Sequence, residues 1–279
     1  MSTQKTIFIT GASSGLGRLT AIHFAQQGWQ VAATIRKPEQ EAELGAHANI
    51  NVLRLDVTDR DQVKAAVSQS IAAFNRIDVV VNNAGVGVYG PLEFADEGTI
   101  DWQFAVNVRG PINIIRAFLP HFRANKSGMF INISSLMGVT TATPVGSLYN
   151  MSKFALEGLT EGLYYELKPL NIELRLIEQG GSKGNRFLEN VIWNTNNDIK
   201  DYDATVQRVK SLFASVEDNP SSDPRLEDPQ QIVDEIYALA MRRNNKFRTP
   251  IGEATKRLIA LRNSLQIEQY LETLAASLD

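Results

Sequence analysis

A tyrosine and a lysine four residues apart, in the stretch YNMSK at 149–153, have the types and spacing for proton transfer. The phenol of Tyr149 can donate a proton, but its ordinary pKa of about 10 is too high for ready exchange at neutral pH. A nearby ammonium favours the phenolate and lowers that pKa. Residues four apart on a helix share a face, so we expect Lys153 to lower the pKa of Tyr149.

A glycine- and serine-rich stretch near the N-terminus has the composition of a phosphate-binding turn. Residues 10–17 read TGASSGLG, where the apolar run TIFIT gives way to a helical pattern. Glycine lets the backbone approach a bulky anion, and the N–H groups at a helix start favour negative charge. The spacing G-x-x-x-G-x-G differs from the common G-x-G-x-x-G fingerprint and from a Walker loop. We therefore predict that this turn binds a pyrophosphate.

The elements that must position these residues follow from a regular alternation of short strands and helices. The expected strands are nearly continuous apolar runs, as in parallel strands covered on both faces. They fall at 6–10, 30–35, 51–57, 77–81, 129–134 and 172–177, with a last edge strand at 247–252. This pattern predicts a single-domain α/β fold, a Rossmann-type doubly wound parallel sheet of about seven strands with helices on both faces.

Helical patterns separate and follow the strands, and one segment breaks the alternation. The expected helices are at 15–27, 59–74, 99–123, 149–167, 230–241, 253–261 and 266–278. Between them, 184–229 is polar and rich in Asn and Asp, which fits either a solvated surface insertion or a flap over a cleft. No linker divides the chain. We expect one domain over 1–279, with about 184–229 as a substrate-loop insertion.

Composition and charge narrow the possible partners. The 279 residues are 43% hydrophobic, carry a net charge of −3 and include no basic block, so we expect no nucleic-acid partner. The chain has no cysteine, and its histidines (His23, His47 and His121) are scattered, so no metal site is expected. Without a signal-peptide pattern or an apolar run of about 20 residues, we expect a cytoplasmic protein that does not contact membranes.

Five motifs, taken in order, resemble those of the short-chain dehydrogenase/reductase family in its compact one-domain branch. They are TGASSGLG at 10–17, NNAG at 82–85, the asparagine of NVRG, the serines that end INISS at 131–135, and YNMSK. Their order and approximate distances agree with the family over about residues 5–180. The resemblance implies an oxidoreductase that moves a hydride between a nicotinamide cofactor and a carbonyl or alcohol group.

By this resemblance, the cofactor would lie along the carboxyl ends of the strands. Asp56 would bind the adenine amino group, although its spacing fits a strand-end cap equally well. The residues that the resemblance assigns to the cofactor are Gly11, Ser13, Ser14, Gly15, Leu16, Gly17, Arg36, Asp56, Val57, Asn83, Ala84, Gly85, Tyr149, Lys153 and Gly180.

The choice between NAD and NADP is made at the end of the second predicted strand. NAD-preferring relatives carry there an acid that repels a 2′-phosphate, whereas this sequence has Ile35. Arg36 and Lys37 follow, and a guanidinium can hold a phosphate bidentately. In related NADP-using reductases an arginine and a serine at the positions of Arg36 and Ser13 contact that phosphate. We therefore predict NADP(H) in preference to NAD(H).

The resemblance also implies a catalytic set of four side chains. Tyr149 would be the general acid in reduction and the base in oxidation, and Lys153 would bind the nicotinamide ribose. Asn107 would anchor a water that relays protons to Lys153. Ser135 would hold the carbonyl oxygen, but it lies one residue further from Tyr149 than is usual in the family, so Ser134 is the alternative.

The sequence departs from the family after the sixth predicted strand, in IEQGGSKGN at 177–185. Gln179 replaces the usual proline before Gly180, and Gly184 stands where a threonine is expected. Loss of the proline should loosen this wall of the nicotinamide site, because proline fixes its own φ and restricts its neighbour. Ser182 could donate the missing hydrogen bond. We expect weaker positioning of the cofactor.

The complete set favours an NADPH-dependent oxidoreductase that reduces a ketone or aldehyde to an alcohol, or runs in reverse. The alternative is an NADP-binding sensor or scaffold of the same fold with little turnover, suggested by the altered segment QGGSKG. A pure binder has no need of the Tyr149–Lys153 pair. We expect a small-molecule carbonyl or alcohol substrate. The resemblance also implies a homodimer or homotetramer formed through helices 99–123 and 149–167.

Overall fold

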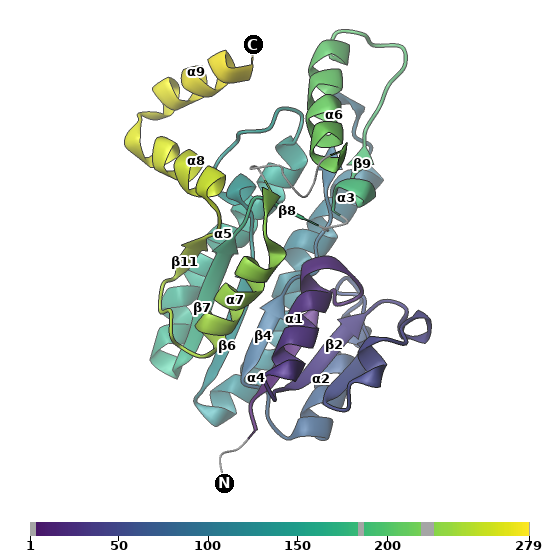
Figure 1. The fold of residues 1–279 in the computed structure, drawn as a ribbon, viewed down its shortest axis with the longest axis vertical. Coiled ribbons are helices and arrows are strands. Elements are labelled where there is room, and N and C mark those ends of the chain that lie inside the picture. Colours follow the sequence, from purple (N-terminus) through teal and green to yellow (C-terminus); the bar gives the residue numbers. More distant parts are fainter. Residues whose placement is uncertain (1–3, 184–186, 219–225, 279) are drawn as a thin grey trace.

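The computed structural model describes residues 4–183, 187–218 and 226–278. A seven-stranded sheet forms the centre of the fold (Figure 1). The strand order is β11-β7-β6-β4-β1-β2-β3, and every neighbouring pair is parallel. The strands are β1 (Thr6–Thr10), β2 (Gln30–Ile35), β3 (Ile50–Arg54), β4 (Val79–Asn82), β6 (Gly128–Ile133), β7 (Ile172–Glu178) and β11 (Arg248–Pro250). The predicted doubly wound parallel sheet is confirmed.

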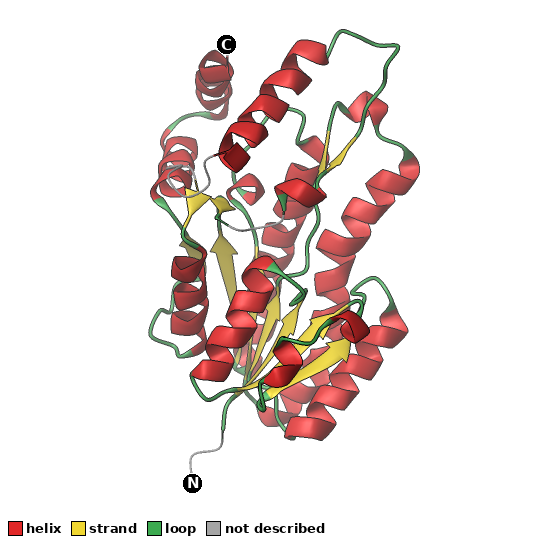
Figure 2. Ribbon diagram, turned by 45° about the vertical axis from the view of Figure 1, so that its right-hand side comes forward, coloured by secondary structure: helices red, strands yellow, loops and turns green. Residues whose placement is uncertain are grey.

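Helices cover both faces of this sheet, because successive strand residues point to opposite sides (Figure 2). In β1, Ile7 and Ile9 belong to a core with α1 (Gly15–Gln26) and α7 (Pro229–Ala240). Phe8, between them, belongs to a second core with the helices of the other face. Those helices are α2 (Arg60–Phe74), α4 (Gly110–Asn125) and α5 (Ser147–Leu167). A strand buried on both sides explains the unbroken apolar runs.

The single helix predicted over 99–123 is interrupted. Its first part is α3 (Glu97–Phe104), where Asp96 caps the start by accepting a hydrogen bond from the Thr99 N–H at 2.7 Å. A π-helical turn, Ala105–Arg109, leads into α4, and the Gly110 N–H donates to the Ala105 carbonyl five residues earlier. Such turns are rare and cluster at functional sites. Asn107 lies in this one.

The segment 184–229 contains more regular structure than the predicted loop. Among its described residues, α6 (Asp203–Asp218) is a helix, and β9 (Ile192–Trp193) pairs with β5 (Val88–Tyr89). β10 (Leu226–Glu227) pairs with β8 (Gly181–Ser182) just after β7. Val209 of α6 is buried, and Phe213 of the same helix packs against Tyr89 and Trp193. This packing stabilises α6, which the polar, Asn- and Asp-rich composition of residues 184–229 does not predict.

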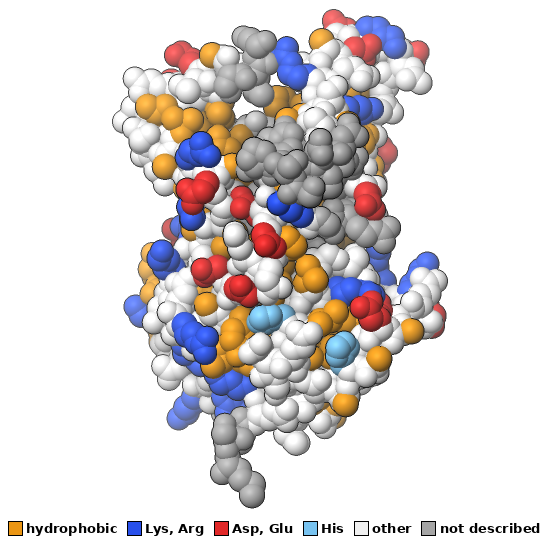
Figure 3. All heavy atoms as spheres, viewed as in Figure 1, with side chains coloured by type: hydrophobic (Ala, Val, Ile, Leu, Met, Phe, Trp, Pro, Cys, Tyr) orange, Lys and Arg blue, Asp and Glu red, His pale blue; other side chains and the backbone are white. Residues whose placement is uncertain are grey.

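The C-terminal helices α8 (Glu253–Ser264) and α9 (Ile267–Leu278) lie beyond the carboxyl ends of the strands (Figure 1). Tyr270 is buried, and its hydroxyl accepts a hydrogen bond from the Thr141 N–H at 3.3 Å. No helix in the described part of the chain is long and apolar enough to cross a membrane. On the face shown in Figure 3, acidic and basic side chains are interspersed.

A substitution at Phe118 tests how much the hydrophobic core beneath α4 contributes to stability. Its side chain is fully buried, 4.9 Å from the Phe8 ring and 5.9 Å from the Phe122 ring between centroids. We expect Phe118→Ala to lower the free energy of unfolding by about 3–5 kcal/mol, because it leaves a cavity. Urea unfolding measures this loss. Leu92→Ala, at a residue 57% exposed, is the control and should cost less than about 0.5 kcal/mol.

Candidate functional site

The glycine-rich turn lies between β1 and α1, at the carboxyl end of β1, which is flanked by β4 and β2 in the sheet. Gly11 has φ +70°, which favours glycine, and a Cβ on Gly17 would lie 2.3 Å from the Gly11 carbonyl oxygen. The Asn83 side-chain amide donates to the Thr10 and Gly11 carbonyls at 2.9 and 3.0 Å. The turn is therefore held close against the end of β4 and leaves no room for larger residues.

The start of α1 has free donors for an anion. Its N-cap, Ser14, is extended and makes no side-chain capping hydrogen bond. The first N–H groups of a helix have no partner within the helix, and they favour negative charge. The predicted residues that line this start are Ser13, Ser14, Gly15, Leu16 and Gly17. An uncapped helix start behind a glycine turn fits a pyrophosphate.

The predicted adenine and 2′-phosphate residues follow β2 and β3. Arg36 and Lys37 are exposed directly after β2, and neither forms an ion pair with any residue that the structure describes. Asp56 accepts hydrogen bonds from the Thr58 N–H and hydroxyl through Oδ1, at 2.9 and 2.7 Å. Val57 is buried against Gly110. The cations are thus exposed at the edge where the ribose of a dinucleotide would lie.

The NNAG segment joins the glycine turn to the predicted catalytic residues. The backbone N–H groups of Asn83 and Ala84 both donate to the Thr10 hydroxyl at 3.0 Å. A Cβ on Gly85 would lie 3.5 Å from the Asn107 Oδ1 and 3.8 Å from the Lys153 Nζ. Gly85 therefore brings the backbone next to both of these polar groups.

Tyr149, near the start of α5, faces the residues that follow β6. The Ser135 hydroxyl hydrogen-bonds to the phenol of Tyr149 and accepts the Met137 N–H at 3.1 Å. Ser134 lies instead beside Glu157, where its hydroxyl lowers the pKa of that carboxyl group, and packs against Gly138. Of the two serines, Ser135 is thus the one beside the phenol.

The pKa of Tyr149 does not follow the sequence expectation. Burial raises the pKa of Tyr149 to about 12, and the hydrogen bond from Ser135 only partly opposes this. The Lys153 Nζ lies 5.8 Å from the centre of the tyrosine ring and donates to the Ile133 carbonyl at 2.9 Å. The predicted lowering of this pKa is therefore wrong for this structure, because desolvation of the phenolate is the largest influence on it.

Lys153 and Asn107 have partners of their own. Burial lowers the pKa of Lys153 to about 8, although the Glu157 carboxylate opposes that shift. The Asn107 amide donates to the Val86 carbonyl at 2.9 Å and to the Ser152 hydroxyl at 3.0 Å, while its Oδ1 accepts the Val86 N–H. Asn107 thus fastens the loop after β4 to α5. The predicted proton-relay water stays a prediction.

The segment after β7 carries several unsatisfied polar atoms. The Gln179 carbonyl accepts the Leu136 N–H at 2.8 Å. Buried atoms without a hydrogen-bond partner among the described residues include the Gln179 Oε1, the Ser182 Oγ and the Thr255 Oγ1. A Cβ on Gly180 would lie 3.0 Å from that Thr255 oxygen. Gly184, the other predicted departure, lies outside the described residues.

An aromatic wall that the sequence analysis largely missed covers Tyr149. Tyr89 stacks on its ring at 5.8 Å between centroids and an angle of 28°, and the Phe187 ring lies 5.2 Å away. Trp193 and Phe213 pack behind Tyr89 at 5.8 and 5.1 Å. Burial also raises the pKa of Tyr89. The signal available was the aromatic residue in VGVYG, directly after the NNAG segment.

The arrangement combines a protonated phenol, a serine hydroxyl and a buried ammonium beneath an apolar aromatic wall. Such a site can hold a substrate oxygen by hydrogen bonds and give it a proton in surroundings that exclude water. The part of the chain that the structure describes contains no cluster of three or more His, Asp or Glu side chains that could bind a metal ion.

Similar proteins of known sequence cover almost the whole chain. A protein of Bacteroides thetaiotaomicron named 3-ketodihydrosphingosine reductase is 34% identical over 258 residues, which are 91% of this chain and 90% of that protein. An uncharacterized oxidoreductase of Bacillus subtilis, YusZ, is 36% identical over 273 residues, or 93% of each chain.

Solved structures share the fold. A short-chain dehydrogenase from Streptomyces avermitilis superposes with a TM-score of 0.80 and 28% identity, over 98% of this chain and 96% of that one. Two more distant structures show the fold with either cofactor. A Burkholderia cenocepacia enzyme contains NADP (TM-score 0.75, 22% identity, 98% of each chain), and a Burkholderia phymatum enzyme contains NAD (0.77, 24%, 93% of each).

The family model described as short chain dehydrogenase matches residues 5–191. That range holds the glycine turn, the NNAG segment, the serine pair and the Tyr149–Lys153 pair. Because the match spans more than half of the chain, the protein is an oxidoreductase of the short-chain dehydrogenase/reductase family, whose members bind a nicotinamide cofactor.

Proposed function

We propose that the protein is an NADPH-dependent reductase of ketones or aldehydes that can also oxidise the alcohol. The observation that carries this proposal is the meeting of Ser135 with the phenol of Tyr149, on the helix that also carries Lys153. The uncapped start of α1 supports it, since that start fits the pyrophosphate of a dinucleotide.

The protein's own groups would divide the work as follows. NADPH, when bound, supplies the hydride. Ser135 donates a hydrogen bond to the substrate oxygen, and Tyr149 gives that oxygen its proton as negative charge develops there. Because the pKa of Tyr149 is about 12, the phenol is protonated and ready to donate at neutral pH. The Lys153 ammonium binds the ribose and stabilises the phenolate left behind.

The preference for NADPH is part of the proposal and rests on residues after β2. The same fold occurs with NADP and with NAD in similar structures, so the fold does not select the cofactor. Selection falls to the exposed cations Arg36 and Lys37 and to Ser13 at the glycine turn. No acid follows β2 directly to repel a 2′-phosphate.

The aromatic wall favours an apolar carbonyl substrate. Tyr89, Trp193 and Phe213 form one aromatic cluster beside Tyr149, and its partly exposed members, Trp193 and Phe213, favour burial of hydrocarbon rather than of a sugar or acid. The Bacteroides relative is named for reduction of 3-ketodihydrosphingosine. We propose a bulky, apolar ketone or aldehyde as the substrate class.

A homodimer or homotetramer is the proposed assembly. Phe104 on α3 and Met151 and Phe154 on α5 are large apolar side chains that are exposed in the single chain. The two helices contact each other, so these side chains can contribute to one apolar face. Burying such a face against a second copy would remove apolar area from water.

Removing one hydroxyl tests the catalytic role of Tyr149. We expect Tyr149→Phe to lower kcat by about 10²–10⁴-fold, because the proton donor is lost while the packing is nearly unchanged. Oxidation of NADPH at 340 nm with a panel of apolar ketones and aldehydes measures kcat. Fluorescence titration of NADPH should give an unchanged Kd. If turnover persists in the variant, this mechanism is excluded, and an absence of turnover in both proteins favours a sensor.

The cofactor assignment is tested at Arg36. We expect Arg36→Gln to raise the Kd for NADPH about 10-fold or more, because a charge-assisted hydrogen bond to the 2′-phosphate is lost. The Kd for NADH should not change. Arg76→Gln is the control, since Arg76 lies before β4 and pairs with Asp78 at 2.7 Å. Equal affinities of the wild-type protein for NADPH and NADH would contradict the assignment.

A further inference from the structure

Glu157 is a buried carboxylate for which the proposed reaction has no role. It lies four residues after Lys153 on α5, so both side chains share one face of the helix. Only 4% of Glu157 and 6% of Lys153 are exposed. Buried carboxylates are rarely retained unless they are paired, so its neighbours indicate its purpose.

Charged groups from two other elements, together with a serine hydroxyl, surround this carboxylate. Arg248 of β11 contacts it, with 3.0 Å between the Arg248 Nε and the Glu157 Oε2. The same Nε lies 3.3 Å from Glu178, the last residue of β7. Ser134, after β6, lies close enough to Glu157 that its hydroxyl lowers the pKa of that carboxyl group. Glu157 thus contacts Arg248 directly, and its charge also interacts electrostatically with Lys153.

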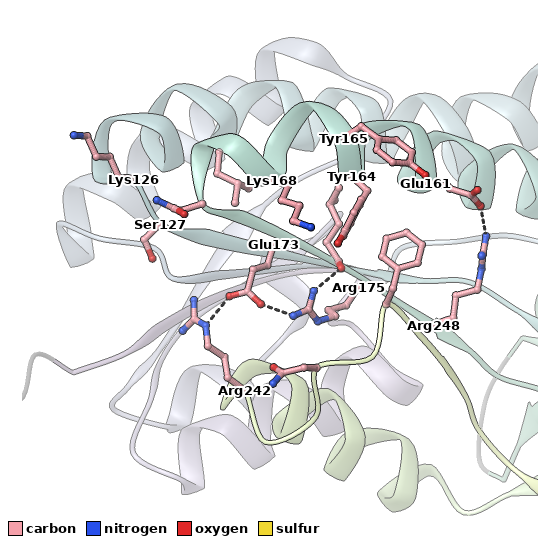
Figure 4. Close-up of a pocket in the computed structure, with 15 residues that line it drawn as sticks. Lys126, Ser127, Glu161, Tyr164, Tyr165, Lys168, Glu173, Arg175, Arg242 and Arg248 are labelled. Atoms are coloured by element: carbon pink, nitrogen blue, oxygen red, sulfur yellow. Dashed lines mark hydrogen bonds and ion pairs between the residues drawn. The ribbon is translucent and has the colours of Figure 1, made fainter.

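Arg248 also reaches an open groove on the surface of the protein. Its Nη2 lies 2.8 Å from Glu161, one helical turn beyond Glu157, and Figure 4 shows this pair at the edge of the groove. The groove has a volume of about 710 Å³, and its lining includes Tyr164, Phe247 and, besides Arg248, several other basic residues. Glu161 is therefore exposed to solvent and Glu157 is not, although both carboxylates contact the Arg248 guanidinium.

The charges of this cluster balance when one carboxyl group is protonated. Lys153 and Arg248 are two cations against the three carboxyl groups of Glu157, Glu161 and Glu178. Burial, together with the nearby Glu157, raises the pKa of Glu178 to about 7, so Glu178 can hold a proton at neutral pH. Burial also raises the pKa of Glu157, but Ser134, Arg248 and Lys153 all oppose this and favour its ionised form.

We propose that Glu157 is a positioning residue that keeps Lys153 charged in its buried site, and that Arg248 holds the Glu157 carboxylate ionised for this purpose. The inference rests on the role proposed for Lys153. Burial alone favours the neutral amine, and the negative charge of Glu157 offsets that effect. An uncharged Lys153 could not stabilise the phenolate of Tyr149.

The first test is the pH profile of kcat for the full-length protein with NADPH and an apolar ketone. In Glu157→Gln the alkaline limb should move down by about one pH unit, because Lys153 loses its proton at lower pH without the carboxylate. Glu157→Asp, which keeps the charge, should restore most of the wild-type profile. Glu161→Gln is the matched control, since its side chain is 55% exposed, and its profile should match the wild type.

A second test does not depend on activity. Urea unfolding of the wild type, Glu157→Gln, Lys153→Met and the double variant gives the coupling between the two side chains. We expect a favourable coupling at about pH 7 that is lost at about pH 10, where a lysine of pKa about 8 is neutral. A coupling that is absent, or that does not change with pH, would overturn the proposal, as would an unmoved alkaline limb in Glu157→Gln.

The two tests separate this inference from the proposed function. If the coupling is present and disappears at high pH, Glu157 holds the charge of Lys153 whatever the reaction is. If Tyr149→Phe then retains full turnover, the proposed chemistry fails while the Glu157–Lys153 interaction stands. If Tyr149→Phe is inactive and the coupling is absent, the chemistry stands and the role of Glu157 is rejected.

Discussion

Burial of the Lys153 ammonium is the constraint on which the rest of the site depends. A charged amine in apolar surroundings is unstable unless hydrogen bonds and opposite charge replace the water that it loses. The structure supplies one carbonyl, that of Ile133 at the end of β6, and the charge of Glu157. Both come from rigid elements, the central sheet and α5. The position of the ammonium beneath Tyr149 is therefore set by the fold itself and not by a mobile loop.

The same burial gives the phenol its chemical character. Tyr149 is shielded by Tyr89 and Phe187, so its phenolate lacks water and its pKa is high. A high pKa keeps the proton on the donor until a stronger base, such as an oxygen receiving a hydride, appears beside it. Electrostatic interactions are stronger where water is excluded, so Lys153 and Ser135 stabilise charge better here than on a surface. In the proposed reaction, a dry site would delay proton loss at rest and support it once charge develops on the substrate oxygen.

Much of the fold was predictable because its signals are local. Apolar runs such as TIFIT and a glycine turn before a helix identify parallel strands and their ligand-binding ends without tertiary information. The missed features depend on distant contacts. The π-helical turn at Asn107 accompanies hydrogen bonds to Val86 and Ser152, and α6 packs on the domain through Val209 and Phe213. The sign of the Tyr149 pKa shift was wrong because spacing reveals a neighbouring charge but not the extent of burial.

The altered segment after β7 fits the same physical reasoning. The buried, unpaired oxygens of Gln179, Ser182 and Thr255 lie among the described residues around Gly180, where the usual proline is missing. Each unpaired buried polar group costs about 1–3 kcal/mol in the free protein. A bound ligand that offers an amide N–H or a hydroxyl at this wall recovers that cost as binding free energy. In the proposed complex, a ligand that pairs these oxygens would therefore gain more at this wall than at one whose polar groups are already paired.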